Sequence, residues 1–107
     1  MNDVTYIEAA RRLAERMIAD GGGRPEERLR YGYRAATAHG PTPQAQTVLL
    51  EGFQHYLENY QSDRSAALEL VSMGESSRDE TMDVAELASY TMVASLILNL
   101  DGTITKE

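Results

Sequence analysis

The chain has 107 residues, which is the length of one domain, and it contains no cysteine. The lack of cysteine excludes a disulfide framework, a thiolate metal site, a cysteine nucleophile and covalent attachment of a c-type haem to this chain. Seventeen acidic residues against ten Lys and Arg give a net charge of −7. An acidic domain repels a phosphate backbone, so we expect no nucleic-acid partner.

The charge is unevenly distributed along the chain. Residues 1–38 hold seven arginines and six acids (net +1), whereas residues 39–107 hold three basic and eleven acidic residues (net −8). The arginine-rich first part leaves DNA binding by a helix-turn-helix as a disfavoured alternative. The longest apolar run, residues 91–100, has about half of the roughly 20 residues that a membrane-spanning helix needs. We therefore predict no membrane span.

Residues 3–20 carry apolar side chains at steps of three and four, which predicts an amphipathic helix with Asp3 as its N-cap. The glycine run at residues 21–23 ends it. On the outer face of this helix we expect two ion pairs, Glu8 with Arg12 and Arg11 with Glu15.

Two prolines predict the next helix starts. Pro25 suits a first helical turn, and the helix that it opens ends at residues 39–40. Thr42 and Pro43 fit the N-cap and first position of a third helix, which extends to about residue 61. A shorter fourth helix follows residues 62–63. The expected buried side chains of these helices are Leu29, Tyr33, Ala36, Leu49, Phe53, Tyr56, Tyr60, Ala67, Leu70 and Val71.

Residues 74–82 are polar and predict a loop, after which Asp83 caps a last helix. From residue 87 to residue 100 that helix is apolar almost all round, so we expect its neighbours to surround it. A turn at residues 101–102 should end it.

Gly32 and Gly52 fall inside predicted helices, where we expect close approach of another helix. No segment has the alternation of a strand. The sequence thus predicts an all-α, single-domain bundle of about five helices, spanning residues 1–107, with an apolar central C-terminal helix.

The best candidate for chemistry lies on the third helix. His55 has Glu51 four residues before it and Glu58 three residues after it, so all three side chains can share one face. A zinc site needs three or four ligands, usually with a second histidine or cysteine, and the other histidine, His39, lies at a helix end. A solvated surface with a Glu–His pair is therefore the favoured interpretation. We expect no catalytic, cofactor-binding or metal-binding residue, with His55, Glu51 and Glu58 as the weak metal candidates.

Three other sequence motifs lack the neighbouring residues or the strand that their function requires. The segment at residues 101–107 resembles half of an EF-hand loop, but Ile97 stands where the first aspartate ligand is needed. Residues 21–23 resemble the start of a dinucleotide-binding fingerprint, and residues 74–76 resemble the start of a nucleophile elbow. Both motifs require a preceding strand, and none is predicted before either segment. Methionines on apolar faces are explained by core packing. Tyr31 and Tyr90 lie off the apolar stripes of their helices, where they either cover helix edges or form a docking surface.

Several segments resemble a known family. They are residues 6–16 (YIEAARRLAER), 26–29 (EERL), the turn at 40–43 (GPTP), 71–76 (VSMGES), and 86–88 (ELA) running into 98–101 (LNLD). In this order, and over nearly the whole chain, they are similar to the carboxy-terminal domain of the large planctomycete-type cytochrome c-associated proteins. Gly102 replaces the glutamate that usually follows this Asn-Leu-Asp ending. The family has no established catalytic residues, so the resemblance assigns none here.

The resemblance implies that the chain is the C-terminal fragment of a longer, exported protein, in the periplasm or cell envelope, and that any haem c lies elsewhere in that parent. We therefore expect a non-catalytic packing or interaction domain whose partner is the remainder of the parent or another protein. The alternative is that the chain contributes part of an enzymatic or electron-transfer site in the full-length parent, with His55, Glu51 and Glu58 as its residues.

Overall fold

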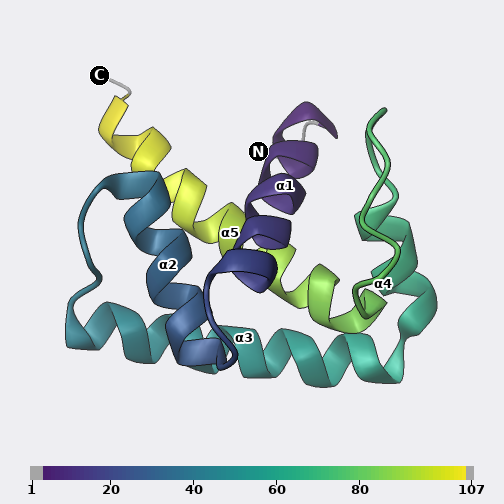
Figure 1. Ribbon diagram of the computed structural model, residues 1–107, viewed down its shortest axis with the longest axis horizontal. Helices are drawn as coiled ribbons and strands as arrows, with labels where there is room; N and C mark the ends of the chain where they lie inside the picture. Colours follow the sequence, from purple (N-terminus) through teal and green to yellow (C-terminus); the bar gives the residue numbers. More distant parts are fainter. Residues whose placement is uncertain (1–3, 106–107) are drawn as a thin grey trace.

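The computed structural model describes residues 4–105, with side chains described for residues 4–100. Within that part of the chain there are five helices and no strand (Figure 1). The predicted all-α bundle is confirmed. The helices are α1 (Val4–Asp20), α2 (Pro25–Thr37), α3 (Pro43–Ser62), α4 (Arg64–Val71) and α5 (Val84–Thr105).

Helix α5 is the centre of the bundle. It crosses the middle of the molecule in Figure 1 and contacts each of the other four helices. Its apolar composition explains this position, because a helix without a polar face must be covered by neighbours. Tyr90 on α5 stacks on Phe53 of α3 with 4.3 Å between the ring centroids. The fully buried apolar side chains of α5 are Ala85, Leu87, Ala88, Tyr90, Val93, Ala94 and Ile97.

The expectation that α5 is surrounded on all sides is wrong at Leu96 and Leu100, although Val93 and Ile97 beside them are fully buried. Leu96 is 42% exposed and Leu100 is 50% exposed. The helix also continues through residues 101–102 to Thr105, where a turn was predicted. A glycine in a helix interior costs only about 1 kcal/mol relative to alanine, which is not enough to end a helix by itself. The yellow end of the α5 ribbon extends past the end of α2 (Figure 1).

The predicted helix starts at α3 and α5 are confirmed by their caps. The Thr42 Oγ1 accepts a hydrogen bond of 3.1 Å from the amide of Ala45, and the Asp83 Oδ2 accepts one of 3.0 Å from the amide of Glu86. These side chains satisfy amide groups that have no partner within the helix. The proposed cap Asp3 lies outside the described residues. Helix α2 ends at Thr37, slightly before the predicted end at residues 39–40.

The two helical glycines differ in their surroundings. A Cβ atom on Gly32 would lie 2.6 Å from the Sδ of Met17, so the predicted close approach of another helix, here α1, is confirmed. The same prediction is wrong for Gly52, because a Cβ atom there would meet no atom within 4 Å.

None of the helices in residues 4–105 combines the length and the apolar character needed to cross a bilayer.

Candidate functional site

The most elaborate polar site joins α1 to the loop between α4 and α5. Three side chains of α1, spaced three and four residues apart, reach this loop: Glu8, Arg11 and Glu15. We call the set formed by these three residues with Ser76, Ser77 and Asp79 the loop clasp. It holds a segment that has no helix or strand of its own, so the loop's conformation depends on side chains that lie more than 60 residues earlier in the chain.

Arg11 is the centre of the loop clasp. Its side chain is 1% exposed, and its Nη1 donates to the Oε2 of Glu15 at 2.9 Å. Its Nη2 donates to the backbone oxygen of Ser76 at 3.0 Å and to the Ser76 Oγ at 2.8 Å, while Nη1 also reaches the backbone oxygen of Ser77 at 3.2 Å. A buried charge with several hydrogen-bonded partners is costly to disrupt, because removal of one partner leaves the others unpaired.

The Arg11–Glu15 pair was expected on the outer face of its helix, and this location is wrong. Arg11 comes four residues after Ile7 and three before Ala14, both of which are buried. Helical geometry therefore places the arginine on the inner face, where the loop covers it. This spacing is visible in the sequence, but the interaction with the loop is not.

Glu8 binds the other side of the same loop. Its Oε2 accepts a hydrogen bond of 2.7 Å from the amide of Ser76 and another from the Ser76 hydroxyl, and its Oε1 accepts one of 3.4 Å from the amide of Glu75. These donors, led by the Ser76 hydroxyl, lower the pKa of the Glu8 carboxyl below its ordinary value, against a smaller opposing effect of burial. The predicted Glu8–Arg12 pair is not formed. The Arg12 Nε instead lies 3.9 Å from the Oε1 of Glu15.

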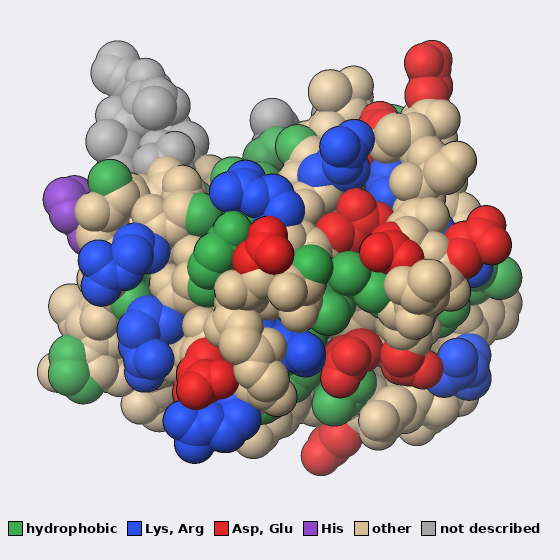
Figure 2. All heavy atoms as spheres, in the orientation of Figure 1, with side chains coloured by type: hydrophobic (Ala, Val, Ile, Leu, Met, Phe, Trp, Pro, Cys, Tyr) green, Lys and Arg blue, Asp and Glu red, His purple; other side chains and the backbone are tan. Residues whose placement is uncertain are grey.

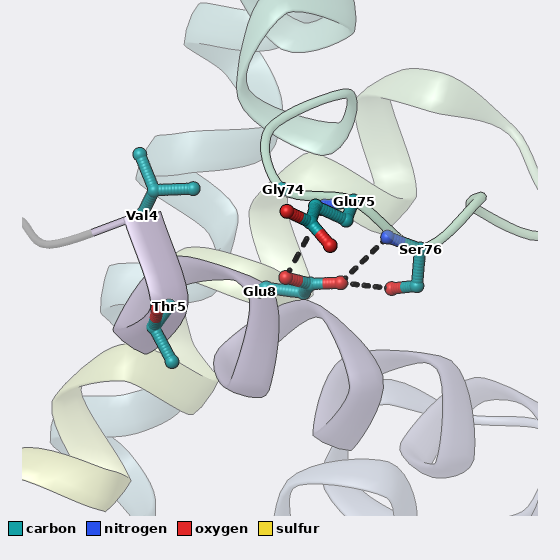
Figure 3. Close-up of a pocket in the computed structure, with 6 residues that line it drawn as sticks. All are labelled: Val4, Thr5, Glu8, Gly74, Glu75 and Ser76. Atoms are coloured by element: carbon teal, nitrogen blue, oxygen red, sulfur yellow. Dashed lines mark hydrogen bonds between the residues drawn. The ribbon is translucent and has the colours of Figure 1, made fainter.

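A pocket of about 600 Å³ opens beside the loop clasp, between the first turns of α1 and the loop (Figure 3). In this view the Glu8 carboxylate points toward the loop and meets the amide and hydroxyl of Ser76. The residues that line the pocket are Val4, Thr5, Glu8, Gly74, Glu75 and Ser76.

The side chains of Glu8 and Ser76 in this pocket are already paired with each other. The Ser76 hydroxyl donates to Glu8 and accepts from Arg11. A carboxylate whose pKa is lowered is a weaker general base, because proton transfer is most efficient when the pKa of the base is near the working pH. The arrangement is thus suited to holding the loop.

The three residues singled out on α3 lie on its outside. Glu51, His55 and Glu58 are all exposed, and the His55 Nε2 lies 3.2 Å from the Nδ2 of Asn59. Among the described residues, no three His, Asp or Glu side chains are placed to hold a metal ion. His39 is also exposed, just beyond the end of α2.

The two tyrosines considered for a docking surface have different environments. Tyr90 is fully buried against Phe53, and the guanidinium of Arg28 lies 5.6 Å from the centre of its ring. Burial raises the pKa of the Tyr90 hydroxyl. Tyr31 is partly buried against the same core. Tyr90 therefore belongs to the core, and it contributes nothing to an outer surface.

Comparison with protein-family models, with curated proteins and with solved structures finds no match to this chain.

Proposed function

We propose that the chain is a non-catalytic packing or interaction domain of a larger, exported, cytochrome-linked protein. The observation that supports this proposal is the exposure of two leucines on one side of α5, toward its C-terminal end. Leu96 and Leu100 lie one helical turn apart and are 42% and 50% exposed. Ile97, between them in the sequence, is fully buried, so the two leucines mark the side of the helix that its neighbours leave open.

Covering the exposed parts of these two leucines would stabilise an association. Burying a whole leucine side chain contributes about 1.5–3 kcal/mol, so covering the remaining half of each side chain would contribute roughly 1 kcal/mol. Residues 87–100 contain no charged side chain, so a partner surface can cover the exposed stretch without having to pair or desolvate a charge on α5.

The experiment compares two surface substitutions in a pull-down with the amino-terminal portion of the parent protein. Leu96→Ser combined with Leu100→Ser should abolish the association, whereas Val48→Ser, at a side chain that is 63% exposed on α3, should leave it unchanged. Thermal unfolding of the isolated variants checks that both remain folded. Failure of the wild-type domain to associate would overturn the proposal.

The second candidate function is a contribution to an enzymatic or electron-transfer site of the parent. It is supported by the accessibility of the α3 residues, since His55, Glu51 and Glu58 are exposed and can reach a substrate or cofactor held by another domain. His55→Ala in the full-length protein should then abolish activity with almost no change in the melting temperature. Unchanged activity would eliminate this candidate.

A further inference from the structure

The loop between α4 and α5 contains a segment that carries no apolar side chain. Residues 74–81 form neither helix nor strand, and their sequence is Gly-Glu-Ser-Ser-Arg-Asp-Glu-Thr. We call this segment the strap. Figure 2 shows Asp and Glu side chains at the surface on the right, where Figure 1 places the loop. Because burial of apolar surface is the dominant favourable term in folding, a segment without apolar side chains depends on its polar contacts.

Hollows open at both ends of the loop clasp. The pocket of about 600 Å³ in Figure 3 lies at the Glu8 end, beside the first residues of the strap. A second hollow of about 430 Å³ lies at the Glu15 end, where α1 faces Asp79 and Met82. Between the two hollows, the hydrogen bonds of the loop clasp connect the strap to α1.

Three side chains of α1 hold the strap by its backbone. Glu8 and Glu15 accept hydrogen bonds from strap amides, and Arg11 donates to strap carbonyl oxygens. A side chain can release the strap without any change in the helix that carries it. Opening therefore breaks the contacts of the clasp and leaves the backbone hydrogen bonds of the helices intact.

One donor of Arg11 gains from opening. The side chain is 1% exposed, and its Nε forms no hydrogen bond with any described residue. A buried donor without a partner is costly, and contact with water removes that cost. Because opening brings Arg11 to water, hydration of Nε offsets part of the loss of the clasp contacts.

The strap also holds both of the glutamates that lie outside helices in the described part of the chain. Glu75 and Glu80 are exposed, whereas every other described glutamate lies within one of the five helices. Exposed polar loops are the preferred sites of proteolytic cutting. The clasp protects one of the two bonds directly, because the amide of Ser76, which forms the bond after Glu75, donates to Glu8 at 2.7 Å.

We propose that the strap opens as a unit while the helices stay folded, and that it is the site at which a glutamate-specific endoprotease cuts the folded chain. Water is the co-reactant: the C–N bond after Glu75 or Glu80 breaks, the carbonyl carbon takes the oxygen of water and becomes a carboxylate, and the nitrogen leaves as an amine. Because α5 contacts each of the other four helices, the two fragments should stay assembled after the cut. The inference is independent of the association through Leu96 and Leu100.

Limited proteolysis of the chain with a glutamate-specific endoprotease tests the proposal, with mass spectrometry to identify the fragments. The first cuts in the wild type should fall after Glu75 or Glu80, and the fragments should elute together in size-exclusion chromatography. Arg11→Met should be cut about tenfold faster or more, because the cutting rate follows the population of the open form.

The matched control separates opening of the strap from unfolding of the whole chain. Leu29→Ala removes a fully buried side chain of α2 and lowers global stability, but it leaves the loop clasp in place. It should be cut within about twofold of the wild-type rate, because local opening is independent of global unfolding. Gly32→Ala is a milder variant of the same kind if Leu29→Ala does not fold, and circular dichroism checks the fold of each.

Four results would overturn the proposal. They are a first cut inside a helix, a wild type that resists the protease until it is unfolded in urea, fragments that separate after the cut, and equal acceleration by Arg11→Met and the α2 variant. An unchanged cutting rate in Arg11→Met would also contradict it, because the clasp would then not hold the strap closed.

Discussion

Arg11 and Ser76 are 65 positions apart in the chain, yet the Arg11 Nη2 donates to both the backbone oxygen and the hydroxyl of Ser76, at 3.0 and 2.8 Å. This contact fixes the loop that leads into the central helix α5. The contact is therefore the first to test.

Arg11→Met should lower the free energy of unfolding by about 3 kcal/mol, because it leaves Glu15 and the loop carbonyl groups without their buried donor. Urea unfolding followed by circular dichroism measures the loss. The matched control is Arg12→Met, one residue further on and 63% exposed, which should change stability by less than about 0.5 kcal/mol. Equal losses for both variants would show that the loop clasp does not stabilise the fold.

The loop clasp should also make stability sensitive to acid. The pKa of Glu8 is lowered in the folded state, so its contribution is fully present above the ordinary glutamate pKa of 4.5 and is lost as the pH falls through the lower folded value. The urea midpoint should fall over that acidic range. In Glu8→Gln the fall should be smaller than in the wild type. Glu58→Gln, at an exposed carboxylate on α3, should leave the pH profile unchanged.

The two helical glycines make a matched pair. Gly52→Ala adds a methyl group in open space and should raise the free energy of unfolding by about 0.5–1 kcal/mol, because alanine restricts the unfolded chain. Gly32→Ala puts the same group 2.6 Å from the Sδ of Met17 and should lower it by about 1–3 kcal/mol. Thermal unfolding of the two variants shows whether each is more or less stable than the wild type. A stabilised Gly32→Ala would mean that α1 and α2 do not pack closely at this point.

The unequal covering of α5 predicts unequal effects of the same substitution. Leu87 is fully buried, so Leu87→Ala should lower the free energy of unfolding by about 2–5 kcal/mol. Leu96 is 42% exposed, so Leu96→Ala in the isolated chain should cost roughly 1 kcal/mol. Denaturant unfolding of both variants measures the difference. A loss at Leu96 as large as that at Leu87 would place both side chains in the core.

The sequence by itself determined the five helices, most of their ends and the central position of α5. Apolar spacing, capping side chains such as Thr42 and Asp83, and prolines act within a few residues, so these features are readable along the chain. Only the tertiary structure decided that Arg11 is buried under the loop, that Gly32 meets Met17 while Gly52 meets nothing, and that Leu96 is left exposed. Each of these depends on which distant segment covers a given helix face, and local periodicity tells which face is apolar but not what lies against it.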